Sequence, residues 1–129
     1  MPRPEARSAA ALSLHALLAL YFAGLAVLMF APVPETPTPL PTYTDKVAHV
    51  VVFFGLAGVW YWDRRHAGRW TAAWVVVASG ATAGLVEVVQ ALLPYRSGDV
   101  ADFVAGAVGA LAGGCLAAVL TRRPGGPAG

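Results

Sequence analysis

Four long apolar runs constrain this chain more than any other feature, because such segments are stable only in a protein core or in lipid. They cover residues 9–31, 47–62, 70–93 and 100–120. A helix needs about 20 apolar residues to cross a bilayer, and the first, third and fourth runs reach that length. The second has about 16 residues and becomes long enough if its helix begins at Asp45 and Lys46, with both charges at the interface.

Composition points to the same environment. Apolar residues make up 57% of the 129 residues and charged residues 12%, against roughly 25% charged in soluble domains. A soluble domain of this size would lack the polar surface to cover itself, so we expect lipid around much of the chain. The net charge of +2 gives no indication of nucleic-acid binding. The single cysteine, Cys115, can form neither an intramolecular disulfide nor a cysteine-built metal site.

Prolines, glycines and charges separate the runs. Five prolines between residues 32 and 41 indicate an extended linker, and the segments 63–69 and 94–98 read as turns. We therefore predict an all-α, membrane-spanning four-helix bundle over residues 9–121, between a cytoplasmic tail (1–8) and a disordered cytoplasmic tail (122–129). Its helices are expected at about 9–31, 45–62, 70–93 and 100–121.

The arginines predict the orientation. All but Arg96 cluster before the first run, between the second and third, and after the fourth, which share one side of the membrane if there are four crossings; the other two loops hold only Lys46 and Arg96. The positive-inside rule places that side in the cytoplasm. The first run exceeds the 7–15 apolar residues of a signal peptide, so we predict an uncleaved helix. With a composition typical of GC-rich bacterial genomes, the expectation is a multi-pass protein of the bacterial cytoplasmic (inner) membrane, both termini cytoplasmic.

This topology gathers the polar residues of the runs near the outer interface. Glu87 lies roughly 9 Å inside the third helix, by helix rise. An unpaired carboxylate there costs a few kcal/mol on insertion scales, so we expect it to face the interior and to pair with His49, Lys46 or Arg96. The residues expected to meet at this depth are Asp45, Lys46, His49, Glu87, Gln90, Arg96, Asp99 and Asp102.

Two interpretations of this cluster stay open. Interhelical hydrogen bonds commonly lock membrane bundles, whereas intramembrane ionisable groups commonly mark functional sites. As a site, the cluster offers His49 and Glu87 as catalytic acid–base candidates, with Lys46 and Arg96 facing anionic oxygens. The remaining ligand-binding candidates are Asp45, Gln90, Asp99 and Asp102. His49 is the single histidine of the cluster, and although it would form a conceivable mixed metal site with Glu87, Asp99 and Asp102, nothing in the sequence demands one. No metal and no cofactor is therefore predicted.

Three stretches resemble the VanZ-like family of small bacterial integral membrane proteins. Residues 45–56 resemble its D-K-x-x-H-x-x-x-F motif, and residues 87–90 with 94–99 resemble its E-x-x-Q…P-x-R signature. Residues 102–109 resemble its D-x-x-x-N-x-x-G ending, although Gly106 stands where the family usually has Asn. The family's polar positions correspond here to Asp45, Lys46, His49, Glu87, Gln90, Arg96 and Asp102.

The resemblance implies a cell-envelope membrane protein, since the family's namesake is associated with low-level resistance to the glycopeptide teicoplanin. We expect the chain to bind, or to bind and modify, an envelope lipid or lipid-linked headgroup at an outer-leaflet polar pocket. The alternative is a non-enzymatic structural or accessory protein whose polar cluster only locks the helices. The expected partners are membrane lipids and a lipid-linked envelope precursor, without nucleic acid; ligand, reaction and oligomeric state do not follow from the sequence.

Overall fold

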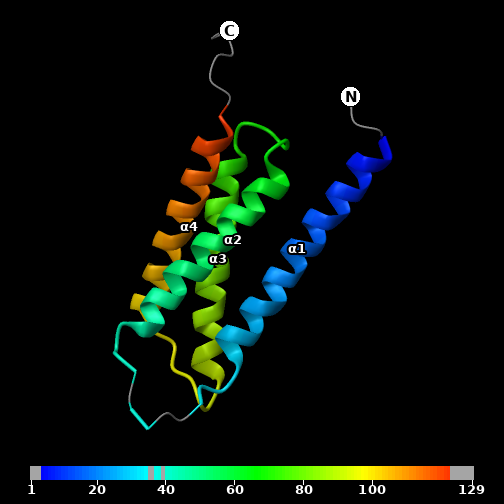
Figure 1. The fold of residues 1–129 in the computed structure, drawn as a ribbon. Coiled ribbons are helices and arrows are strands. Elements are labelled where there is room, and N and C mark those ends of the chain that lie inside the picture. Colours follow the sequence, from blue (N-terminus) through cyan, green and yellow to red (C-terminus); the bar gives the residue numbers. More distant parts are fainter. Residues whose placement is uncertain (1–3, 35–36, 39, 123–129) are drawn as a thin grey trace.

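The computed structural model describes residues 4–34, 37–38 and 40–122, and in those ranges the chain forms four helices and no strand (Figure 1). The predicted all-α, four-helix class is therefore confirmed. The helices are α1 (Pro4–Phe30), α2 (Thr44–Arg64), α3 (Thr71–Leu92) and α4 (Val100–Thr121).

The largest difference from the expected helix limits is at the start of α1. The sequence places residues 1–8 in a tail, whereas the helix already begins at Pro4. Proline is tolerated in a first helical turn, because its missing N–H is not needed there, and the alanines that follow favour the helix. The predicted disordered tail falls mostly on residues 123–129, outside the described ranges.

Three of the four helices are long and apolar enough to cross a membrane. The spans are Ser13–Phe30 in α1, Thr71–Leu92 and Val100–Thr121. The remaining helix, α2, has 21 residues, but both of its ends are charged: Asp45 and Lys46 at the start, Arg64 at the end. Length and composition thus support three of the four predicted crossings.

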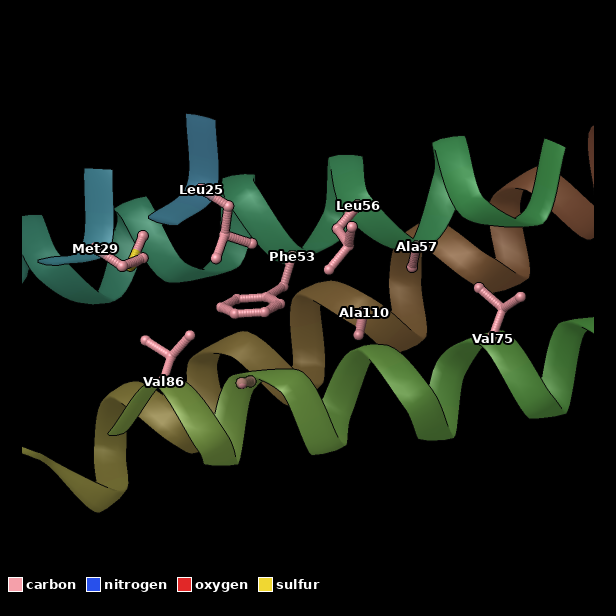
Figure 2. Close-up of a cluster of buried hydrophobic side chains, with 9 residues drawn as sticks. Leu25, Met29, Phe53, Leu56, Ala57, Val75, Val86 and Ala110 are labelled. Carbon is pink, nitrogen blue, oxygen red and sulfur yellow. The ribbon is translucent and has the colours of Figure 1, made fainter. Parts of the chain in front are cut away.

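The core is built around α2. Its buried face carries His49, Phe53, Leu56 and Ala57. Figure 2 shows the Phe53 ring between α2 and the facing helices, with side chains of α1, α3 and α4 around it. The apolar core residues are Leu25, Met29, Phe53, Leu56, Ala57, Val75, Ala83, Val86 and Ala110. Because lipid tails are as apolar as these side chains, close packing rather than water exclusion holds such a core together.

Glycines let α2 and α4 approach backbone to backbone. A Cβ atom at Gly109 would overlap the carbonyl oxygen of Val50, and one at Gly113 would overlap that of Phe54. The G-x-x-x-G spacing in α4 is therefore used for packing inside one chain, as membrane helices commonly use small residues.

Gly106 is also a packing position. A Cβ atom there would lie 2.9 Å from Ala83 Cβ and 2.9 Å from Phe53 Cδ2. This chain has no room for the asparagine that the VanZ-like pattern usually has at this place. The departure from the motif follows from how closely three helices meet at Gly106.

The first helix docks mainly through its C-terminal half. Leu25 and Met29 are its buried residues within the part whose side chains are described. Tyr21 donates a hydrogen bond of 2.7 Å from its hydroxyl to the carbonyl of Val52 in α2. Towards its N-terminal end α1 leans away from the other three helices (Figure 1). Before it does so, α1 still meets α2 at His15, whose Nδ1 lies 3.6 Å from Asp63 Oδ1.

Candidate functional site

The polar residues gather where α1 and α3 end and α2 and α4 begin (Figure 1). A cavity of about 470 Å³ opens at this polar end of the bundle. Its lining includes every predicted site residue except Glu87, which lies behind His49. The predicted residues on its wall are Asp45, Lys46, His49, Gln90, Arg96, Asp99 and Asp102.

His49 and Glu87 form a buried pair. His49 Nε2 lies 2.8 Å from Glu87 Oε1, and their side chains are only 5% and 10% exposed. Of the three partners that the sequence allows for Glu87, the structure selects His49. The His49 ring also stacks on Phe53, with centroids 6.1 Å apart, so the apolar core supports it.

The backbone of α2 determines where the imidazole proton lies. His49 Nδ1 is 2.8 Å from the carbonyl oxygen of Asp45, one helical turn earlier. A carbonyl can only accept, so Nδ1 is the donor and carries a proton. The contact between Nε2 and Glu87 Oε1 then needs one shared proton, giving either imidazolium with carboxylate or imidazole with carboxylic acid. The pair is neutral in both forms.

The second oxygen of Glu87 is held by the turn before α4. Glu87 Oε2 accepts a hydrogen bond of 2.8 Å from the backbone N–H of Asp99. Gly98 permits this approach, because a Cβ atom there would lie 2.7 Å from the Glu87 carbonyl oxygen. The Asp99 side chain caps α4 by accepting a 2.8 Å hydrogen bond from the Ala101 N–H. That bond and the Lys46 ammonium lower the pKa of Asp99.

Lys46 joins α2 to the start of α4. Its Nζ lies 3.1 Å from both Asp99 Oδ2 and Asp102 Oδ1. An ammonium group has three N–H donors, so two are used here. The lysine that the sequence offered for anionic oxygens is thus already neutralised by carboxylates, with one donor left for a ligand.

Three residues from the end of α3 and the turn that follows hold the end of α1. Gln90 Nε2 donates to the Met29 carbonyl at 2.8 Å, and the Tyr95 hydroxyl donates to that of Phe30 at 3.1 Å. Arg96 Nη2 donates to the carbonyls of Leu28 and Ala31 at 3.2 and 2.8 Å. The last carbonyls of a helix have no partner within it, so these side chains cap α1.

Sequence reasoning named Gln90 and Arg96 as ligand-binding candidates, and the structure shows that both make these interhelical bonds. It missed the site roles of Tyr95 and Gly98. Both residues belong to the segment 94–98, which the sequence predicts only as a turn. The available signal was their position directly beside Arg96 and Asp99.

The cavity wall is not strongly cationic. Three carboxylates, Asp45, Asp99 and Asp102, face two cations, Lys46 and Arg96. With the His49–Glu87 pair neutral, the wall carries a formal charge of −1. A ligand that brings hydrogen-bond donors as well as acceptors suits it better than a bare anion.

An apolar groove of about 440 Å³ adjoins the polar cavity. It runs between the end of α1 and the start of α2, and most of its wall is aliphatic. The cavity and the groove share Val33, Asp45, His49 and Arg96. The groove's other lining residues are Val27, Leu28, Met29, Ala31, Pro32, Pro34, Thr44 and Ala48.

The fold and the site define a small helical membrane protein with a buried His–Glu pair at one end of the bundle. The VanZ/LLP1 family model matches residues 13–121, which include all four helices from the apolar part of α1 onward. The chain belongs to the VanZ/LLP1 family.

A curated relative comes from a eukaryote. Uncharacterized protein C11E3.10 of the fission yeast Schizosaccharomyces pombe is 40% identical over 81 residues, which cover 59% of this chain and 46% of the relative. The chain therefore spans about half the length of the relative that it matches. Since this relative is a yeast protein, likeness to it gives no support to the predicted bacterial source. No solved structure matches the chain.

Proposed function

We propose that this VanZ/LLP1 protein binds an amphiphilic molecule of the cell envelope, an envelope lipid or a lipid-linked headgroup, at the polar end of the bundle. The observation that carries the proposal is the junction of the two hollows on His49, Asp45 and Arg96. A polar headgroup in the cavity would leave its hydrocarbon chain in the aliphatic groove beside α1. Ligand sites are typically concave and apolar with a few placed polar groups, which fits this pair of hollows.

The charge of the cavity wall limits which kind of headgroup can bind there. Because the wall carries three carboxylates and two cations, we expect a zwitterionic or hydroxyl-rich headgroup. Hydroxyl or ammonium groups would donate to the aspartates, while the remaining Lys46 donor would bind an oxygen of the ligand.

Acid–base chemistry is the second step of the proposal. His49 lies on the cavity wall and shares one proton with Glu87 behind it. A headgroup hydroxyl that separated His49 Nε2 from Glu87 Oε1 would find an imidazole nitrogen and a carboxylate oxygen with one proton between them, so the atom without the proton would serve as the base. The predicted setting is the outer leaflet of a bacterial inner membrane, with a glycopeptide (teicoplanin) resistance phenotype.

The proposal is tested by blocking the groove with a bulky side chain. In Ala48→Trp the indole would occupy the aliphatic wall beside α1, whereas Val51→Trp places the same group on the face of α2 where Val51 is 61% exposed. Native mass spectrometry after mild detergent extraction should show a co-purified lipid with the wild type and with Val51→Trp, but not with Ala48→Trp. Equal lipid retention by the two variants would contradict the proposal.

The alternative is a structural or accessory role, favoured by one observation. Four polar side chains of the site connect separate parts of the bundle. The end of α1 accepts bonds from Gln90, Tyr95 and Arg96, and Asp99, just before α4, accepts one from Lys46 of α2. Under this alternative, Glu87→Gln and His49→Ala lower the thermal stability in detergent without changing lipid retention or glycopeptide susceptibility.

A further inference from the structure

Three helices bring potential metal ligands to one point. His49 of α2, Glu87 of α3 and Asp102 of α4 each place a ligand atom within 4.8 Å of the other two. All three residues are buried, with 4%, 8% and 7% of their surfaces exposed. His49 and Asp102 also line the polar cavity, so an ion could reach them from there.

Two of these three residues are oriented by a second hydrogen bond, which each makes to the protein backbone. His49 gives its Nδ1 proton to the Asp45 carbonyl, and Glu87 Oε2 accepts from the Asp99 N–H. Metal-binding histidines and carboxylates are usually held by such second bonds. The atoms left over, His49 Nε2 and Glu87 Oε1, are fully buried and have no hydrogen-bond partner in the described chain beyond their mutual contact.

Distances and charge suit a small divalent ion. Ligand bonds of about 2.1 Å place tetrahedral ligands about 3.4 Å apart, between the 2.8 Å contact of His49 with Glu87 and the 4.8 Å limit of the cluster. One neutral imidazole and two carboxylates carry a charge of −2, which balances a divalent cation. An imidazole ligand favours transition metals over Mg²⁺ or Ca²⁺.

We propose that His49, Glu87 and Asp102 bind one divalent transition-metal ion, of the kind represented by Zn²⁺ and Mn²⁺. The ion takes the place of the proton that His49 and Glu87 otherwise share. The remaining coordination positions face the cavity, where water or a ligand oxygen completes them. The inference goes beyond the lipid proposal and does not depend on it.

Lys46 gives the proposal a distinctive consequence. Its ammonium lies 3.1 Å from Asp102 Oδ1 and competes with a metal for that carboxylate. Removing this charge in Lys46→Gln should tighten metal binding by about tenfold. For an anionic ligand the same variant should weaken binding, so the two kinds of ligand are distinguished.

The test uses the full chain without an affinity tag, purified in detergent, loaded with Zn²⁺ and desalted. Elemental analysis should give one Zn²⁺ per chain, with less than a tenth of that in Glu87→Gln, His49→Ala and Asp102→Asn. His66→Ala is the matched control, because His66 is an exposed histidine in the turn between α2 and α3. It should retain full occupancy, as should Val51→Trp, because Val51 is 61% exposed.

A wild type that holds no more Zn²⁺ than Glu87→Gln overturns the proposal, as does loss of Zn²⁺ in His66→Ala alone. A variant that fails to fold is replaced by a measurement on the wild type. Electron spin echo spectra of bound Mn²⁺ should show coupling to one histidine nitrogen, and a spectrum without nitrogen coupling rejects the site.

Discussion

Gln90 donates a 2.8 Å hydrogen bond from its side-chain amide to the backbone carbonyl of Met29, so the end of α3 fastens the end of α1. Gln90 is 3% exposed and Met29 is 3% exposed, which places this bond inside the bundle. The carbonyl at a helix end has no partner in its own helix, and a side chain from another helix supplies it.

Breaking this bond should loosen α1. We expect Gln90→Leu to lower the free energy of unfolding by about 1–2 kcal/mol, because a buried carbonyl loses its donor. Thermal unfolding in detergent measures the change. Thr82→Val is the matched control on the same helix, since the Thr82 hydroxyl donates within α3 to the Ala78 carbonyl one turn earlier. An equal loss of stability in both variants would show that the bond to α1 adds no stability beyond that of a bond within one helix.

The tautomer of His49 can be read by nitrogen NMR. Because Nδ1 faces the Asp45 carbonyl, the ring should be either the Nδ1–H tautomer or the imidazolium, and never the Nε2–H tautomer alone. Detection of a neutral ring protonated only at Nε2 would contradict the geometry described above.

The pair of His49 and Glu87 should show strong coupling. Removing one partner leaves the other buried without its contact, so we expect His49→Leu and Glu87→Leu to cost about 3 kcal/mol each. The double variant should cost clearly less than the sum, since neither buried polar group remains. Unfolding free energies of the four proteins form the cycle, and additive costs would show that the two side chains do not interact.

Replacing glycine by alanine should change the stability in opposite directions at Gly109 and Gly80, because the two glycines have different surroundings. Gly109→Ala places a methyl group on the Val50 carbonyl and should lower the melting temperature, because α2 and α4 must separate. Gly80→Ala is the control in α3: nothing lies within 4 Å of the added Cβ, and helix propensity favours alanine by about 1 kcal/mol. A Gly109→Ala protein as stable as the wild type would show that the helices are not in backbone contact.

The family's usual asparagine should not fit at position 106. Gly106→Asn would push against Ala83 Cβ and the Phe53 ring, so the folded yield and melting temperature should fall. Adding Ala83→Gly removes one of the two obstacles and should restore part of the loss. Rescue by this second change, compared with Ala83→Gly alone, tests whether crowding is the cause.

The sequence predicted the number and type of the helices because lengths of apolar run, prolines and turn residues are local signals. It also indicated that Glu87 needs a partner from another helix, because a buried carboxylate is costly alone. It left three partners open, since the choice of His49 over Lys46 depends on which face α2 turns towards α3, while Arg96 is used by its bonds to the end of α1. The close contacts of Gly109 and Gly113 with the α2 backbone help to fix how α2 is turned.

Contacts to backbone atoms were beyond sequence reasoning. The carbonyls of Asp45 and Met29 accept the bonds that orient His49 and Gln90, yet a carbonyl has the same chemistry in every residue. The sequence predicts that Asp45 and His49 meet in the polar cluster, and it is the Asp45 main chain that meets the ring. Such partners become visible only once the helices are placed.

The first helix is fastened at its C-terminal end and diverges from its neighbours at the other (Figure 1). The carbonyls of Met29 and Ala31, which accept these bonds, belong to residues that also line the aliphatic groove. Gln90 and Arg96 therefore hold one wall of the groove in place, and a change that frees these carbonyls alters the groove together with the bundle.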